Sequence, residues 1–167
     1  MIHITLQKLD DWFNEPEAQL EDRPKLLSKL ALLEVCGWIE GEFDRLIRDA
    51  EAGRLNDAIW CEKNVVRNNS GFHYEKHLRK MFVQVFGEYT ARKIEVEMEV
   101  RYPGELARLG ALLATLWEKR CSFAHADFAA NVAAQKTFDA PSWCIDAQKT
   151  VRELVGKFEL CMVAALP

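Results

Sequence analysis

Apolar side chains recur at helical spacing along most of the chain, and they predict a bundle of helices. Residues 4–13 form a short amphipathic pattern that ends at the Asn-Glu-Pro run 14–16. A long helix is predicted over 22–52, because its first residue is an aspartate, a good N-cap, and Pro24 is accepted in a first turn. Gly53 then stops it. Its first half is apolar almost all round, as expected of a central helix.

The middle of the chain continues this helical pattern. A shorter helix is predicted over 55–66, and the polar run 68–71 is a loop signal. Residues 72–86 form the next helix, with Gly87 as its stop. In 89–100 apolar residues alternate with charged ones, so a helix is favoured but a strand is possible.

Two further helices follow. Pro103 opens the first of them, and its apolar stripe consists of leucines and one tryptophan: Leu106, Leu109, Leu113, Leu116 and Trp117. Residues 131–142 have a less regular pattern. Asp146 is predicted to cap the final helix. The sequence therefore predicts one all-α domain over 1–167, a helical bundle with short loops and a long central helix.

Composition narrows the class of protein. The 167 residues are enough for one domain with a real core. A net charge of -4 argues against a broad nucleic-acid-binding surface and leaves room for a local basic site. The cysteines are odd in number, with none at CxxC spacing, which favours a reduced, cytoplasmic protein over a disulfide framework or a zinc site. No signal peptide and no membrane-spanning apolar run is visible.

The candidate chemistry lies where the apolar stripe of the sixth predicted helix ends. Arg120 continues that stripe, and His125 follows at Arg-x4-His spacing, with Asp127 two residues further on. Histidine moves protons near neutral pH and arginine binds phosphate by paired hydrogen bonds, and metal-free RNA cleavage needs both. Asp127 is suited to orient the imidazole. Alternatively, Arg120 ends the helix at the surface and pairs with Asp127, which shares its helical face.

Regular helix geometry does not place the two candidate groups on one face. Arg120 and His125 are separated by about 140° around an ideal helix. They meet if the helix distorts between them, if the long arginine reaches back, or if the groups meet across a two-fold interface. These three possibilities remain open at this point.

Two more segments, together with the Arg-x4-His run, carry a family resemblance. The first is Trp38-Ile39-Glu40-Gly41, an aromatic residue followed by an acid inside the long helix. The second is the loop Asn68-Asn69-Ser70-Gly71-Phe72, followed by a helix from Tyr74. In this order, over residues 22–127, the segments resemble HEPN domains, and the loop is similar to that of the RNase-LS-like bacterial groups.

The resemblance implies an α-helical homodimer in which two motifs face one cleft, with metal-independent endoribonuclease activity and no cofactor. The ribose 2′-OH would attack the adjacent phosphate. His125 would be the general acid or base, and Arg120 would stabilise the phosphorane charge. Asp127, Glu40 and Ser122 would support them. Such domains commonly serve as toxins or in phage defence, which implies an antitoxin or defence-system partner protein.

The chain departs from the family pattern in two places. Cys121 follows the arginine, where the family often has asparagine. Asp127 stands where the toxin branch paired with small nucleotidyltransferases has a tyrosine. The resemblance therefore does not point to that branch.

A modest basic face is predicted around the loop and the helix that follows it. Such a face either stays solvated or guides RNA phosphates, and RNA rather than DNA is the expected substrate. Its candidate RNA-binding residues are Arg67, Asn69, His73, Lys76, His77, Arg79 and Lys80.

Two other functions remain as alternatives. In the first, Arg120, His125 and Asp127 form a polar network in a non-catalytic helical interaction module. In the second, His73 and His77, at i, i+4 spacing, hold zinc for a metal-dependent enzyme. The HExxH pattern is not present around these histidines, so no metal site is predicted.

Overall fold

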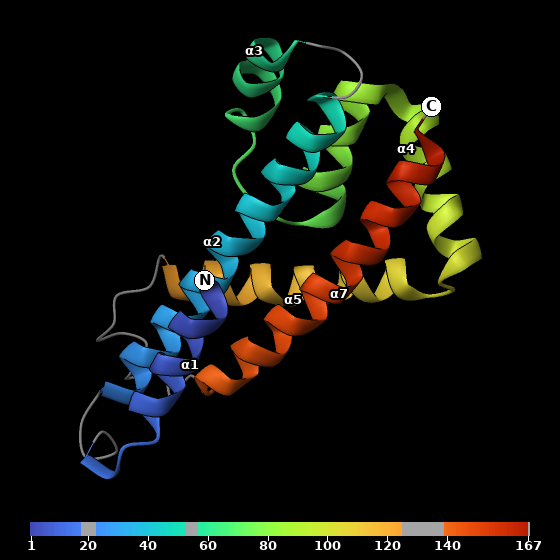
Figure 1. Cartoon of the computed structure of the whole chain (residues 1–167). Helices are drawn as coiled ribbons and strands as arrows, with labels where there is room; N and C mark the ends of the chain where they lie inside the picture. Colours follow the sequence, from blue (N-terminus) through green and yellow to red (C-terminus); the bar gives the residue numbers. More distant parts are fainter. Residues whose placement is uncertain (18–22, 53–56, 125–138, 167) are drawn as a thin grey trace. The chain divides into compact units, whose positions relative to one another are not determined.

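The computed structural model of the chain describes residues 1–17, 23–52, 57–124 and 139–166. Within these ranges every regular element is a helix, which confirms the all-α prediction (Figure 1). The possible strand near residues 89–100 is also helical. No helix in the described ranges combines the length and the apolar character that crossing a membrane requires.

The helices occur close to their predicted positions. Their bounds are α1 Ile2–Phe13, α2 Arg23–Ala52, α3 Ala58–Cys61, η2 Glu62–Val66, η3 Tyr74–Leu78, α4 Arg79–Arg101, α5 Glu105–Ala124 and α7 Pro141–Ala165. The two elements η2 and η3 are π-helical turns. The predicted cap Asp22 and stop Gly53 lie outside the described residues, whereas Pro24 lies in the first turn of α2 as expected.

The start of α7 corrects one prediction. Asp146 was expected to cap this helix, but the helix begins at Pro141 and Asp146 lies inside it. Proline suits the first position of a helix because its fixed φ is already helical and its missing N–H would have no partner there. The carbonyl of Asp146 accepts a hydrogen bond from the Thr150 hydroxyl at 2.9 Å, as an interior residue of a helix allows.

The chain divides into two compact units. Unit 1 comprises Met1–Trp38 and Thr115–Thr150, and unit 2 comprises Ile39–Ala114 and Val151–Pro167. Helices α2, α5 and α7 each contribute residues to both units. The two units are described separately below.

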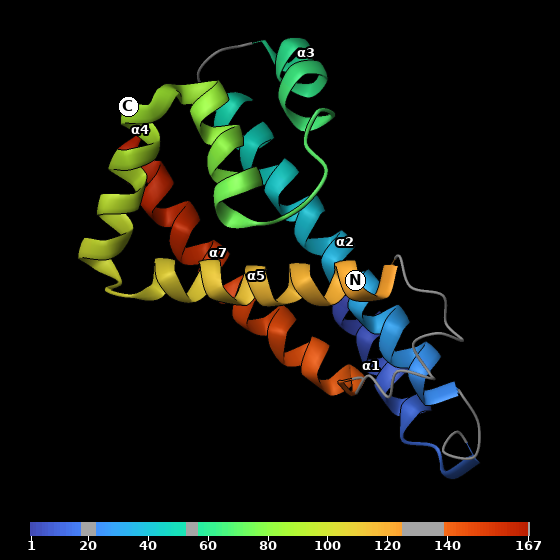
Figure 2. The same cartoon turned by 180° about the vertical axis from the view of Figure 1, so that it is seen from behind.

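Unit 1 is built from α1 and parts of α2, α5 and α7, and α1 runs beside the first half of α2 in both views (Figures 1 and 2). Its buried side chains include Leu6, Leu9, Leu32, Val35, Leu116, Phe123 and Ile145. The first half of α2 is less completely buried than its sequence suggested. Leu26 is 53% exposed and Leu30 is 44% exposed.

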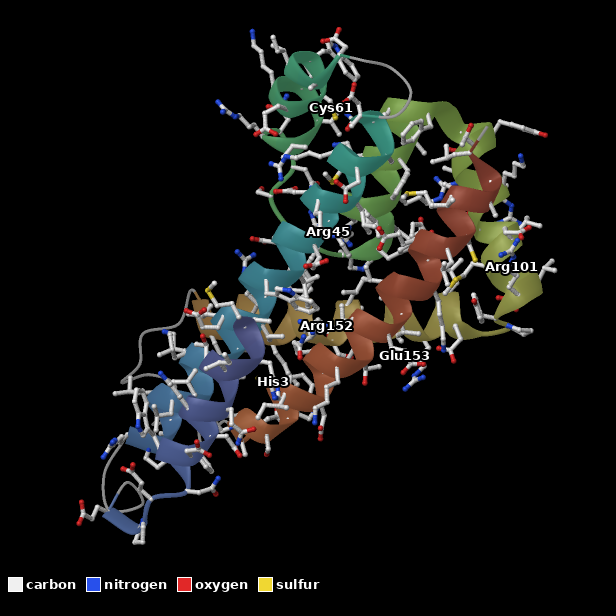
Figure 3. All side chains as sticks on the ribbon, viewed as in Figure 1. His3, Arg45, Cys61, Arg101, Arg152 and Glu153 are labelled. Atoms are coloured by element: carbon white, nitrogen blue, oxygen red, sulfur yellow. The ribbon has the colours of Figure 1, made fainter. Side chains whose placement is uncertain are left out.

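Unit 2 has an aromatic core around Phe158 of α7. The Phe158 ring lies 5.4 Å from that of Phe82 and 6.3 Å, edge on, from that of Tyr74. Arg45 of α2, labelled in Figure 3, also binds Glu159 of α7 through both terminal nitrogens, at 3.1 and 3.2 Å. Residues 151–167 are therefore an integral part of the core that 39–114 begins.

Gly87 divides α4 into two limbs. Its φ of 82° lies in the left-handed region, where glycine is favoured because it lacks a Cβ atom. The predicted helix stop is thus a kink, since the helix resumes directly and continues to Arg101 (Figure 2). Residues of η3 and of the second limb of α4 both line a cavity of unit 2.

Candidate functional site

Arg120 lies in the last turns of α5, in unit 1, and it is half-buried. Its guanidinium carbon lies 5.5 Å from the centre of the Trp117 ring. The spacing of three residues places both side chains on one face of the helix. A guanidinium group that rests on an indole keeps its charge.

The neighbouring Lys119 is held in a similar way. Its ammonium group pairs with Asp139 at 2.6 Å and lies 5.1 Å from the centre of the Trp143 ring. Burial, followed by the charge of Asp139, raises the pKa of the nearby Cys144 thiol to about 12. Because the thiolate is the reactive form, Cys144 is an inert core residue.

The described part of α5 ends at Ala124. His125 and Asp127 therefore lie outside the described residues, and their predicted roles stay predictions. Ser122 is exposed on the last turn of the helix, and Cys121 is half-buried. The chain stays helical from Arg120 to Ala124, and the three possible ways in which Arg120 and His125 could meet remain open.

Glu40 lies on α2 within unit 2, whereas Arg120 belongs to unit 1. The Glu40 side chain is half-buried, and one of its carboxylate oxygens is shielded from solvent. The supporting role of Glu40 stays a prediction.

Some residues of the predicted basic face are exposed, and others make hydrogen bonds or ion pairs within the protein. Lys76 and Lys80 are exposed. Arg67 is also exposed, with its Nε 3.4 Å from Glu62. Asn69 donates a hydrogen bond to the carbonyl of Gly71 at 3.3 Å, which closes the predicted loop. The loop and the exposed lysines thus lie at the start of one helical segment, as the sequence predicts.

The two histidines of this segment are linked through the backbone. The Nδ1 atom of His77 accepts a hydrogen bond from the backbone N–H of His73 at 2.9 Å, so it stabilises the start of η3. Burial, then the charges of His73, Lys76 and Lys80, lower the pKa of His77 below its ordinary value. Among the described residues no three His, Cys, Asp or Glu side chains form a metal-binding group.

A cavity of about 670 Å³ lies between η3, the second limb of α4 and the first half of α5, all within unit 2. Two predicted RNA-binding residues, His73 and Arg79, line it. The Nδ1 atom of His73 is shielded from solvent and has no hydrogen-bond partner among the described residues. The cavity thus brings together part of the predicted basic face with groups that the sequence analysis did not select.

Glu95 is the centre of this missed cluster. It is 7% exposed, and its Oε1 accepts hydrogen bonds from Tyr74 at 3.2 Å and from Arg79 Nε at 2.7 Å. Its Oε2 accepts a hydrogen bond from Arg92 at 3.2 Å. Burial, then the negative charge of Glu95, raises the pKa of Tyr74, so that phenol remains a hydrogen-bond donor.

One signal in the sequence could have identified Glu95. It lies four residues after Ala91 and three before Met98, and both of these residues are buried. A glutamate on the apolar face of an amphipathic helix needs a buried partner, because an unpaired carboxylate is costly in the core. Arg92 lies on the same limb of α4, but Tyr74 comes from η3 and Arg79 from the first limb of α4, so spacing alone does not reveal these two partners.

Arg79 is fully engaged at the rim of this cavity. Its terminal nitrogens bind Glu88, and its Nε binds Glu95. The Arg79 guanidinium in turn holds the pKa of Glu88 below its usual range. The donors of Arg79 are therefore used by Glu88 and Glu95. The exposed lysines remain the candidates for contact with RNA phosphates.

No protein-family model matches the chain, and no curated protein and no solved structure is significantly similar to it.

Proposed function

We propose that this protein is a metal-independent endoribonuclease of the HEPN type. The observation that carries the proposal is Arg120, which is held on the Trp117 ring in the last turns of an apolar helix, with His125 five residues later. A charged, pre-oriented guanidinium suits a phosphate group on which charge develops. The all-helical architecture agrees with the fold class that the HEPN resemblance implies.

In the proposed reaction the ribose 2′-oxygen attacks the adjacent phosphorus, and the bond to the 5′-oxygen breaks. The products are a 2′,3′-cyclic phosphate and a 5′-hydroxyl end. His125 transfers the proton, and Arg120 stabilises the charge of the phosphorane. A homodimer with a composite active site supplies two such histidines, one as base and one as acid. Glu40, Ser122 and Asp127 are proposed to support these groups.

Outside the reacting groups, the exposed Lys76 and Lys80 are proposed to guide RNA phosphates to the enzyme. The protein would act in the cytoplasm as a toxin or a phage-defence effector. Uncontrolled RNA cleavage is lethal to a cell, so an antitoxin or another partner protein would restrain it.

The test is the incubation of purified protein with total RNA in EDTA. His125→Ala is expected to lower the cleavage rate by about 10²–10⁴-fold, which is the usual contribution of a general acid or base. His3→Ala, on the exposed side of α1, is the matched control and should cleave like the wild type (Figure 3). Full activity of His125→Ala would contradict the catalytic assignment.

Arg120→Ala should cause a comparable loss, and its control lies on the same helix. Arg108 is half exposed and pairs with Glu105 one turn away. Arg108→Ala therefore removes one arginine from α5 without touching the motif. Equal loss of cleavage in both variants would show a general charge effect instead of a role for Arg120.

The second candidate is a non-catalytic helical interaction module, and exposed apolar side chains in unit 1 favour it. Leu26 and Leu30 lie one turn apart on α2, and Trp12 of α1 is 45% exposed. Exposed apolar side chains of this kind, where they are contiguous, are typical of a protein-binding face. This reading predicts that Leu26→Lys with Leu30→Lys abolishes association, and that neither wild type nor variant cleaves RNA.

A further inference from the structure

We propose that the cavity of unit 2 binds one unpaired purine nucleotide of a single-stranded RNA, with guanine preferred. The inference rests on the proposed function for the nature of the ligand. The binding itself can be measured with free nucleotides. The cavity volume of about 670 Å³ lies within the usual range for small-ligand sites, roughly 300–1,000 Å³.

The floor of the cavity suits a flat ring. It consists of small residues on one face of α5, namely Ala107, Gly110, Ala111 and Ala114. A Cβ atom added to Gly110 would meet no heavy atom within 4 Å beyond the helix itself. The space above this glycine is therefore open, and a planar base can lie against an apolar surface there.

Of the two arginines that line this cavity among the described residues, Arg92 has more unused donors. Its side chain is 70% exposed, and its hydrogen bond to Glu95 uses Nη1. Its Nε and Nη2 donate no hydrogen bond within the described ranges, whereas Arg79 is engaged by Glu88 and Glu95. Arg92 can therefore bind one phosphate or stack on a base with its guanidinium plane.

Glu75 supplies the selectivity for guanine. Its side chain is 67% exposed, and its nearest cation, Arg79 Nε, is 3.8 Å away. The carboxylate oxygens of Glu99 both accept from the backbone N–H of Gly104 at 3.2 Å, so Glu75 is the freer acceptor. Guanine presents two adjacent donors, N1–H and the 2-amino group, that match a carboxylate, whereas uracil presents one donor between two acceptors.

The charge of the lining limits the ligand further. Three carboxylates, Glu75, Glu95 and Glu99, face two guanidinium groups, so the cavity does not attract a polyanion. A single phosphodiester unit fits this balance better than a triphosphate. Guanosine monophosphate is therefore expected to bind more tightly than guanosine triphosphate.

Isothermal titration of the full chain with guanosine 5′-monophosphate tests the proposal. Uridine 5′-monophosphate and ribose 5-phosphate are the comparison ligands, and each should bind about tenfold more weakly or worse. Glu75→Gln should remove this preference. Equal affinity for guanosine 5′-monophosphate and ribose 5-phosphate would overturn the proposal.

Gly110→Leu fills the space above the floor and should abolish binding. Gly156→Leu is the matched control on α7, because a Cβ atom there also meets nothing within 4 Å. If Gly110→Leu does not fold by circular dichroism, Arg92→Ala replaces it, since that side chain is mostly exposed. Unchanged binding in the folded cavity variant refutes this site.

The nuclease and the nucleotide site fail in different ways. Metal-free cleavage that depends on His125, without nucleotide binding, would refute the site and leave the nuclease intact. Guanosine monophosphate binding that depends on Gly110, without RNA cleavage, would support the site and contradict the nuclease.

Discussion

The two halves of α5 differ in where the charged side chains beside them come from. Its first half, up to Ala114, belongs to unit 2 and offers small side chains to a cavity. The charged groups of that cavity come from other elements: Glu75 from η3, and Glu95 and Arg92 from α4. Its second half belongs to unit 1 and carries its own cations, Lys119 and Arg120, each next to an indole ring.

The two sites therefore differ in how they are built: the Arg120 site lies within one helix, and the cavity needs several elements. The Arg120 arrangement depends on a spacing of three residues within one helix, so it survives small shifts of neighbouring elements. The cavity exists only when η3, α4 and α5 are in register, because no single helix supplies both its floor and its charges. Substitutions in the cavity should therefore change the stability of the protein. A substitution at Arg120 should instead change the proposed reaction.

Among the substitutions that test this difference between the two sites, Glu95→Gln is expected to have the largest effect on stability. The amide keeps the size of the side chain but leaves Arg79 without its buried counter-charge, while the more exposed Arg92 loses little. The free energy of unfolding should fall by about 2–3 kcal/mol, below the range for fully buried pairs because water reaches the arginines. Urea denaturation measures it.

Tyr74→Phe is the milder control for this cluster. It removes one hydrogen bond to Glu95 and keeps the ring that packs against Phe158. A loss of about 1 kcal/mol is expected. If Glu95→Gln costs no more than Tyr74→Phe, the carboxylate is not the organising group of the cavity.

Gly110→Ala tests whether the open floor serves stability. Alanine is better than glycine inside a helix by up to about 1 kcal/mol, and the added methyl group meets no neighbour at this position. Gly156→Ala should give a similar gain for the same reason. Thermal unfolding of both variants checks this. A clear loss of stability in Gly110→Ala alone would contradict the open space beside Gly110.

The smallest effect is a pH dependence that involves His77. Its pKa is lowered in the folded protein from the ordinary value of 6.5, so the unfolded chain binds the proton first as the pH falls. Stability is therefore complete above the unfolded pKa and is lost as the pH falls through the folded pKa. His77→Asn keeps an acceptor for the His73 N–H and should show a weaker loss of stability on acidification.

The measurement for His77 is the midpoint of urea unfolding at a series of pH values from neutral to acidic. His3→Asn is the matched control, because His3 is exposed on α1 and has no part in η3. Identical pH profiles for wild type and His77→Asn would exclude the histidine as the source of the dependence.

The helices could be predicted because apolar periodicity, proline and glycine act over short stretches of sequence. The stop at Gly87 was identified, and the structure adds that the chain continues as a second helical limb. The prediction that Asp146 caps the last helix was wrong, because Pro141 already provides a favourable start five residues earlier.

The candidate sites could be predicted only in part, because a sequence pattern reveals contacts within one helix and not those between separate elements. Arg120 and Trp117 interact within one helix, and the spacing reveals them. Tyr74 and Glu95 are 21 residues apart and meet only after η3 and α4 have packed. Their partnership depends on the direction that the chain takes at Gly87, which no short pattern encodes.

The composition of unit 2 has a consequence for synthesis on the ribosome. Residues 39–114 emerge well before 151–167, yet the ring of Phe158 completes the core around Tyr74 and Phe82. At about 5–20 residues per second, the delay between these segments lasts a few seconds. During that interval the aromatic side chains of η3 and α4 remain available to chaperones. The part of α5 that forms the floor of the cavity is also made before Phe158 completes the core of unit 2.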